Sequence, residues 1–233
     1  MQISELEYKN ILEDKYSKAR LETALGLIKP YLKKATKILD IGVYTGDLFK
    51  ILPVTTDYYG VDNDEKALKI AQERGVKVCK LDIENQPLSF KSKEFDVIIA
   101  MEVLEHMKDP ERLIQQISNL LSDGGVVLLS LPNECTILHR FKVMFGRGID
   151  GTAFAPHYHL HFPTLRQNDD FVRKYFKIIK KKYWIHLGTG NAERVLSIFS
   201  YGFWLALANL RPSLFARGVI YLCAKFNSAY SGL

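Results

Sequence analysis

The residues of clearest chemical meaning in this sequence are two glycines and a carboxylate. Gly42 and Gly46 follow the apolar run 37–41, and Asp62 follows a second apolar run, 57–61. A glycine turn lets the backbone approach the charged part of a ligand, and an acid that ends the next strand binds ribose hydroxyls. The spacing therefore predicts a nucleoside site at the carboxyl end of an α/β sheet.

Further acids are expected along the same edge, and they discriminate between nucleosides. Asp40 precedes the glycine turn, Asp82 follows the third expected strand and Glu102 follows the fourth. A dinucleotide would need the pattern G-x-G-x-x-G and room for phosphates near the turn, whereas Asp40 and Asp47 place negative charge there. The acids favour a cationic ligand, S-adenosylmethionine, which carries a sulfonium and an ammonium group. A nicotinamide-dependent oxidoreductase is the disfavoured alternative.

The elements that must position these residues alternate between strand and helix. Continuous Val, Ile and Leu runs predict buried strands, and Asp64 and Asp109-Pro110 are typical helix starts. We therefore expect an α/β fold with a doubly wound, mostly parallel sheet that helices cover on both faces. The expected strands are 37–41, 57–61, 76–81, 95–100, 126–131, 176–184 and 218–226.

The domain organisation is expected to be simple. Residues 1–233 are predicted to form a single domain, with an amphipathic N-terminal helix within 3–34. Segments 133–163 and 188–216 interrupt the rhythm of the sheet, and we interpret them as lid segments because long aperiodic loops in compact domains usually bind ligands.

Composition narrows the class of protein and its surroundings. The net charge of +6 mildly favours an acidic partner such as phosphate, nucleic acid or an anionic membrane. Three cysteines without metal or redox spacing, and a charged N-terminus without a signal peptide, predict a cytoplasmic protein. The longest uncharged run, residues 195–210, is shorter than the ~20 residues that cross a bilayer.

Taken together, these motifs resemble the class I S-adenosylmethionine-dependent methyltransferases. ILDIGVYTG resembles their first motif, YYGVDND their second-strand acid, and LDIEN the segment that flanks adenine. FDVIIAMEVLEHMKDP resembles the strand-four motif, and LSDGGVVLLSLPN the turn into strand five. The five motifs cover about residues 31–133, and the remainder is similar to the family's closing antiparallel pair. The resemblance implies a Rossmann-like, seven-stranded sheet with an antiparallel last strand, and S-adenosylmethionine as cofactor.

The resemblance also implies a role for each residue of the cofactor site. The glycine turn would approach the methionyl part, Asp62 would bind both ribose hydroxyls, Asp82 would accept from the adenine amine, and Glu102 would lie beside the sulfonium. For any one of these acids, helix capping or loop solvation is the alternative. The expected cofactor-binding set is Asp40, Gly42, Tyr44, Gly46, Asp62, Asn63, Asp82, Ile83, Met101 and Glu102.

Tyr44 departs from the family pattern, which usually has glycine at this position. A side chain there would narrow the pocket or stack over the ligand. Because residues other than glycine avoid positive φ, Tyr44 predicts that φ in this part of the turn is negative.

Methyl transfer needs alignment, exclusion of water and, for a hydroxyl acceptor, removal of a proton. The candidate catalytic bases are His106, His159 and His161; a helix-start histidine or a pocket rim of hydrogen-bonded histidines is the alternative. Glu102-x-x-Glu105-His106 is similar to the E-x-x-E-H of metal-assisted O-methyltransferases of ubiquinone biosynthesis and of small-RNA 3′ ends. With a lid histidine it would complete a divalent site, but in many relatives the same letters serve only the cofactor, so no metal ligand is assigned.

The methyl acceptor is the least constrained part of the prediction. Residues 131–164 are similar to the region after strand five in ubiquinone-type O-methyltransferases and in methyltransferase-like proteins of methionine biosynthesis. This similarity favours O-methylation of a small molecule or of a lipid- or sugar-linked hydroxyl. Residues 195–210 would pack on the core as a lid helix or make a peripheral membrane contact, with Lys180–Lys182 meeting anionic headgroups.

Two further functions stay open at this point. A catalytically silent S-adenosylmethionine-binding regulatory or partner protein is compatible with Tyr44 and with the lack of a clear base. An RNA methyltransferase ranks lower, since the basic strand around Lys180 carries no recognisable base-stacking platform, and a nucleic-acid partner is not expected. The sequence predicts no oligomeric state.

Overall fold

The N-terminal part of the fold is a helix that lies within the predicted range 3–34. The computed structural model describes residues 15–52, 56–148, 159–186 and 198–226. Helix α2 (Lys15–Ile28) passes into a 3-10 turn, η1 (Lys29–Tyr31), which contains Pro30. Proline lacks a backbone N–H and cannot continue an α-helix. Residues 3–14 of the expected helix lie outside the described part of the chain.

The described residues contain one seven-stranded sheet of order β3-β2-β1-β4-β5-β7-β6. Its strands pair in parallel, except that β7 runs antiparallel to both β5 and β6. This arrangement confirms the predicted mostly parallel sheet with an antiparallel last strand. The strands are β1 (Lys37–Ile41), β2 (Asp57–Asp62), β3 (Lys77–Lys80), β4 (Phe95–Met101), β5 (Leu121–Pro132), β6 (Lys177–Trp184) and β7 (Gly218–Ala224).

The strand order reverses between β1 and β4, and ligands of such sheets bind beyond the carboxyl ends of the strands near this point. One difference from prediction lies in β5, which begins at Leu121 rather than at Val126. Leu121 already pairs with Phe95, and the register then shifts between Phe95 and Val97. Gly124, at φ +98°, lets the strand absorb this irregularity.

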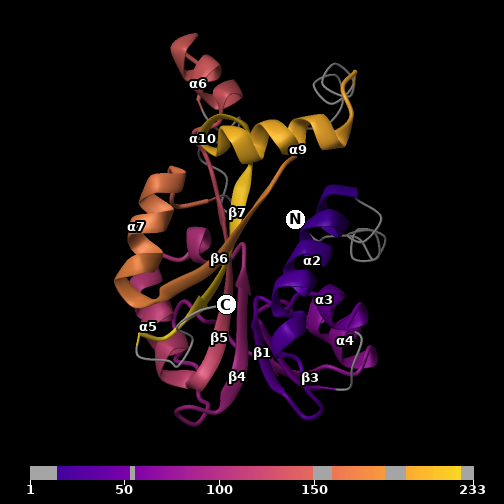
Figure 1. Ribbon diagram of the computed structural model, residues 1–233. Coiled ribbons are helices and arrows are strands. Elements are labelled where there is room, and N and C mark those ends of the chain that lie inside the picture. Colours follow the sequence, from indigo (N-terminus) through magenta and orange to yellow (C-terminus); the bar gives the residue numbers. More distant parts are fainter. Residues whose placement is uncertain (1–14, 53–55, 149–158, 187–197, 227–233) are drawn as a thin grey trace.

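Helices cover both faces of the sheet (Figure 1). Helices α2, α3 (Asp47–Lys50) and α4 (Glu65–Glu73) lie on one face, and α5 (Pro110–Leu120) and α7 (Leu165–Tyr175) lie on the other. Each face has its own core of buried aliphatic side chains. Asp109 caps α5 by accepting from Arg112 N at 3.0 Å, which fixes the loop between β4 and α5 at the carboxyl edge.

Three further helices lie beyond the carboxyl end of the sheet (Figure 1): α6 (Ile137–Met144), α9 (Tyr201–Leu210) and α10 (Pro212–Phe215). The interpretation of 133–163 as an aperiodic loop is therefore wrong for α6, which Thr136 caps. The helix is short and none of its residues is buried, so its apolar side does not face the core as that of a surface helix usually does. No helix in the described ranges has the length and apolar character needed to span a membrane.

Candidate active site

The glycine turn after β1 brings its backbone close to the backbone at the end of β2. The N–H groups of Gly42 and Val43 both donate to the carbonyl of Val61, at 2.9 and 3.1 Å. Gly42 has φ +72°, and a Cβ at this position would lie 2.7 Å from Cγ2 of Val103. Gly46 also has a positive φ, of +73°. Both predicted glycines are therefore needed by the backbone itself.

Tyr44, between these glycines, corrects the sequence prediction. Its φ is +49°, so the expected negative value is wrong. The left-handed conformation costs a non-glycine residue about 1–2 kcal/mol. The N–H of Tyr44 donates to Asp62 Oδ2 at 2.8 Å, and a charge-assisted bond of this kind offsets that cost.

Asp62 therefore organises the turn and also stands at the end of β2. Its other oxygen, Oδ1, accepts from the N–H of Asp64 at 3.0 Å. Each carboxylate oxygen can accept more than one hydrogen bond, and the residue is partly exposed. Asp62 thus keeps the capacity for the two ribose contacts that the sequence predicts. Asn63, next to it, is exposed.

The charge of the turn is smaller than the sequence suggests. Asp40 is buried and accepts from the hydroxyl of Tyr58 at 2.6 Å. Burial raises the pKa of Asp40 to about 7, and the nearby charge of Asp62 adds to this effect. Asp47 forms an ion pair with Arg74 at 2.7 Å between Oδ1 and Nη1. Most of the negative charge offered to a ligand at this turn therefore belongs to Asp62.

The loop after β3 is shaped by its own polar residues. The carboxylate of Asp82 accepts from Asn85 Nδ2 at 2.7 Å and from Glu84 N at 3.1 Å, so it caps this loop. Arg112, which the sequence did not single out, donates to the carbonyls of Ile83 (2.7 Å) and Glu84. The loop is thus tied to α5, with Asp82 and Ile83 partly exposed as an adenine site requires.

Glu102 ends β4 in an unusual conformation, with φ +55°. Its Oε1 accepts from Ser130 Oγ at 2.5 Å, and its Oε2 pairs with Nη1 of Arg20 at 3.3 Å. The guanidinium of Arg20 also lies over the ring of Trp184, 5.2 Å from its centroid. Helix α2 is thereby fastened over the carboxyl ends of the central strands. Met101, the preceding residue, is partly buried.

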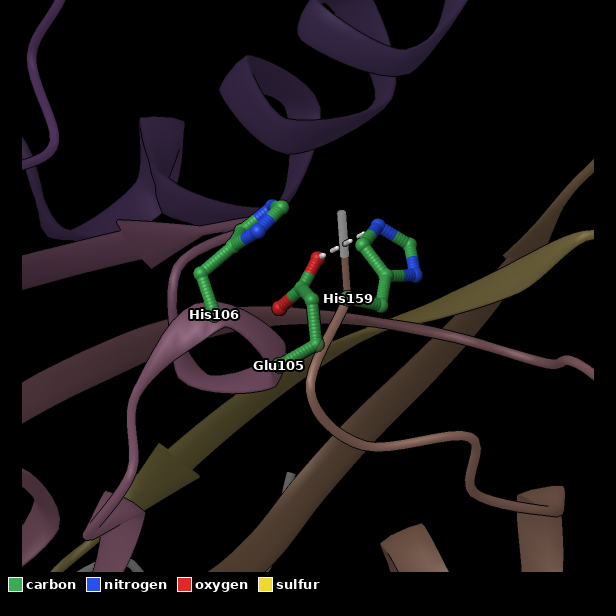
Figure 2. A group of neighbouring side chains, drawn as sticks. All are labelled: Glu105, His106 and His159. Atoms are coloured by element: carbon green, nitrogen blue, oxygen red, sulfur yellow. Dashed lines mark ion pairs between the residues drawn. The ribbon is translucent and has the colours of Figure 1, made fainter. Parts of the chain in front are cut away.

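Beyond Glu102, the turn η2 (Leu104–His106) forms a cluster with a residue from far along the chain (Figure 2). Glu105, His106 and His159 each offer a ligand atom, and these atoms lie within 4.8 Å of one another. Both carboxylate oxygens of Glu105 are buried without a hydrogen-bond partner. Burial, and then the charge of Glu102, hold the pKa of Glu105 well above its ordinary value.

His159 is oriented by partners on its other side. Its Nδ1 lies 2.9 Å from Glu134 Oε1, while Glu134 Oε2 pairs with Nη1 of Arg217 at 2.7 Å. Burial opposes ionisation of Glu134, but hydrogen bonds from His159 and Arg217 outweigh it and lower its pKa to about 2. An ionised Glu134 accepts a hydrogen bond from a protonated Nδ1 of His159. The other ring nitrogen, Nε2, faces Glu105 and lies 3.9 Å from its Oε1.

The three predicted catalytic histidines do not all meet. His106 and His159 come together, with ring centroids 4.8 Å apart. His161 lies outside this cluster, and its Nε2 is 2.8 Å from the carbonyl of Met107. His157, a neighbour of the predicted set, lies outside the described residues. The backbone N–H groups of Leu160 and His161 donate to the carbonyl of Glu105, which holds this segment against η2.

Two cavities adjoin the cluster. One of 250 Å³ is lined by Arg20, Glu102 and His159 together with aromatic and polar residues of α2 and β6. The other, of 350 Å³, is mostly apolar and is lined by Leu104, Glu105 and residues of α7. The first cavity contacts both the predicted sulfonium neighbour Glu102 and the candidate base His159.

Comparison with known proteins places this geometry in context. Residues 8–167 match a family model described as a methyltransferase domain. An uncharacterized protein of Methanocaldococcus jannaschii is 33% identical over 100 residues, which cover 43% of this chain and 46% of that protein. A ubiquinone biosynthesis O-methyltransferase of Leptothrix cholodnii is 30% identical over 105 residues, which cover 42% of this chain and 45% of that protein. The match thus spans less than half the length of each relative.

Solved structures show the same fold. An S-adenosylmethionine-dependent methyltransferase of Thermotoga maritima, described as a possible histamine N-methyltransferase, aligns with a TM-score of 0.59 at 20% identity, over 94% of this chain and 100% of that one. The N-methyltransferase NodS of Bradyrhizobium japonicum, in complex with S-adenosylhomocysteine, aligns with a TM-score of 0.57 at 14% identity, over 92% and 90% of the chains. The predicted Rossmann-like architecture is confirmed by these likenesses.

Proposed function

Because this chain belongs to the methyltransferase-domain family, we propose that it transfers the methyl group of S-adenosylmethionine to a hydroxyl of a small-molecule or lipid- or sugar-linked acceptor. Membership bears out the sequence-based identification of an S-adenosylmethionine-dependent methyltransferase. The choice of a hydroxyl acceptor has weaker support from the partial similarity to ubiquinone biosynthesis O-methyltransferases.

The observation that carries the proposal is the environment of Glu105. A buried carboxylate without a hydrogen-bond partner costs several kcal/mol unless a ligand or a proton satisfies it. Glu105 lies next to His106 and His159, and His159 lines a cavity that also contacts Glu102. A site of this kind can remove the proton of an acceptor hydroxyl. An uncharged amine acceptor would not need this step before it attacks the methyl carbon.

In this proposal, S-adenosylmethionine supplies a methyl carbon that its sulfonium activates for in-line displacement. Asp62 and the turn around Gly42 hold the nucleoside and methionyl parts, and Glu102 lies beside the sulfonium. His159 Nε2 would accept the hydroxyl proton as the acceptor oxygen bonds to the methyl carbon and the bond from that carbon to sulfur breaks, with S-adenosylhomocysteine as the leaving group. Glu134 stabilises the resulting imidazolium through Nδ1.

The same cluster also fits a divalent cation. Two imidazoles and one carboxylate are ligands that zinc and similar transition metals accept. The hydrogen bond from His159 Nδ1 to Glu134 is the outer contact that usually orients a ligating histidine. Ligand atoms of a tetrahedral zinc lie about 3.4 Å apart, so the present spacing of up to 4.8 Å requires a small contraction. Such a cation would lower the pKa of a hydroxyl that it contacts.

The test uses the purified protein, S-adenosylmethionine and a panel of phenols, polyprenyl phenols and sugar hydroxyls, with S-adenosylhomocysteine formation as readout. Glu105→Gln and His159→Gln should each lower turnover by about 100-fold or more while leaving the affinity for S-adenosylmethionine within about twofold. The matched control is Glu111→Gln, since Glu111 is an exposed glutamate on α5 that pairs with Lys174. Wild-type turnover in both cluster variants would refute the assignment.

The role of a cation has separate readouts. Zn²⁺ or Mn²⁺ should bind the wild type in calorimetry and raise its melting temperature, and Glu105→Gln should abolish both effects. If chelation leaves turnover unchanged and no cation binds, His159 acts as a base without metal. If no acceptor in the panel is methylated while S-adenosylmethionine binds tightly, the silent-binding alternative gains support.

A further inference from the structure

Helix α6 leaves the body of the molecule with its apolar side uncovered. No residue of α6 is buried, and the helix projects from the carboxyl end of the sheet (Figure 1). Leu138 is 50% exposed, Phe141 48%, Met144 64% and Phe145 74%. Side chains of this size rarely stand exposed together on a soluble protein unless the patch has a binding role.

The exposed side chains of α6 are arranged in a stripe. At about 100° of rotation per residue, Ile137, Leu138, Phe141, Met144 and Phe145 fall within a sector of about 120°. We call these five residues the α6 stripe. Val143 is also exposed, at 53%, but it points to the opposite side of the helix. The segment therefore has the amphipathic pattern of a helix that lies at an interface.

The charge next to the stripe has one sign. Residues 135–149 contain Arg140, Lys142 and Arg147 and no acidic residue, and all three cations are exposed. On the helix, Lys142 lies beside one border of the stripe and Arg140 beside the other. Two copies of α6 packed together would bring these cations into repulsion, which argues against a second copy of this chain as the occupant. An anionic surface with an apolar interior satisfies both features.

A second exposed apolar group lies at the same end of the molecule (Figure 1). Phe199 and Phe203, at the start of α9, stack with ring centroids 4.7 Å apart and are 53% and 43% exposed. They belong to the described part of the segment 195–210, for which the sequence leaves open a lid helix packed on the core or a peripheral membrane contact. Helices α6 and α9 thus both present exposed apolar side chains beyond the carboxyl end of the sheet.

We propose that α6 docks this protein on an anionic phospholipid bilayer, with the α6 stripe buried at the headgroup boundary and Lys142 and Arg147 at the headgroups. The cations nearest the apolar surface are then those of α6 rather than Lys180 and Lys182, which the sequence suggested. The proposal does not depend on the methyl acceptor, because docking needs neither cofactor nor turnover.

The test is co-sedimentation with vesicles of phosphatidylcholine alone or mixed with phosphatidylglycerol, at low and high salt. The wild-type protein should pellet with the mixed vesicles at low salt, and less so at high salt. Phe141→Ser with Phe145→Ser should weaken partitioning by about tenfold or more, and Lys142→Glu with Arg147→Glu by about tenfold. Because α6 has no buried residue, these variants should keep the wild-type melting temperature.

Two matched controls make the result specific. Val143→Ser removes exposed apolar surface from the wrong side of the helix and should leave binding unchanged. Lys180→Glu with Lys182→Glu reverses two exposed charges on β6 and should have less effect than the reversal in α6. The proposal is overturned if no vesicle binds, if neutral vesicles bind equally well, or if the β6 and Val143 variants lose as much binding as the α6 variants.

Discussion

The buried carboxyl of Asp40 makes the stability of this protein depend on pH in an unusual direction. The carboxyl group is buried and its folded pKa is about 7, against an ordinary value of 3.8. The folded protein therefore holds a proton there that the unfolded chain releases between about pH 4 and pH 7. The stability contributed by this proton is fully present below about pH 4 and is lost as the pH rises through about 7.

The replacement Asp40→Asn removes this ionisation while keeping an oxygen that accepts from the Tyr58 hydroxyl. Each unit of pKa corresponds to about 1.4 kcal/mol, so the difference between 3.8 and about 7 corresponds to at most about 4 kcal/mol. The variant should have nearly the wild-type free energy of unfolding at about pH 4. At about pH 8 it should be more stable than wild type, by up to that amount.

Urea unfolding followed by circular dichroism at about pH 4, 6 and 8 measures this difference. Asp57→Asn is the control on the same sheet, because the Lys77 hydrogen bond lowers the pKa of Asp57. Loss of the Asp57 carboxylate should lower the free energy of unfolding slightly, and only above about pH 4. If the wild type and Asp40→Asn keep a constant difference across the whole pH range, Asp40 does not titrate as a buried acid and the reasoning is wrong.

Two further substitutions test the site and its support. Asp62→Ala should weaken S-adenosylmethionine binding about 100-fold in calorimetry, since two charge-assisted hydrogen bonds are lost. Asp57→Ala, at the other end of β2, should leave this affinity unchanged. Equal affinities of the two variants would exclude Asp62 from the site. Gly218→Ala should lower the free energy of unfolding by about 1–3 kcal/mol, because its Cβ would lie 2.6 Å from the indole of Trp184. Gly26→Ala in α2, with nothing within 4 Å, should stabilise slightly; a destabilised Gly26 variant would show that small side chains are excluded generally.

The cofactor half of the protein was predictable because its parts are local. The glycine turn and Asp62 lie within one strand–helix–strand unit, and the Tyr44–Asp62 bond spans only 18 positions. Hydrophobic runs identified the central strands in the same way, because such a run is read from consecutive residues. Tyr44 was the local exception. A rule about φ that holds for isolated residues was overruled there by one hydrogen bond to Asp62, which a sequence pattern does not reveal.

The cluster of Glu105, His106 and His159 was only partly predictable because distant segments complete it. Glu105 and His106 belong to a recognisable motif, but His159 is oriented by Glu134 and Arg217, and the last two are 83 positions apart. No periodicity relates residues at such separations. Arg20 and Arg112 were missed for a similar reason: a single arginine on a helix usually indicates a solvated face. Glu134 had one usable signal, an acid three residues after the predicted fifth strand.

Glu102 lies between the cofactor turn, which the sequence predicted, and the Glu105 cluster, which it predicted only in part. Its backbone leaves β4 in the left-handed conformation, and η2 begins two residues later, so the positions of Glu105 and His106 relative to the cofactor turn are set by the central sheet. His159 instead depends on the bonds of the following segment to the carbonyl of Glu105 and on Glu134. The proposed cofactor site and the proposed base therefore depend on different parts of the chain. For this reason, substitutions at Asp62 should change affinity for the methyl donor, whereas those at Glu134 should change turnover.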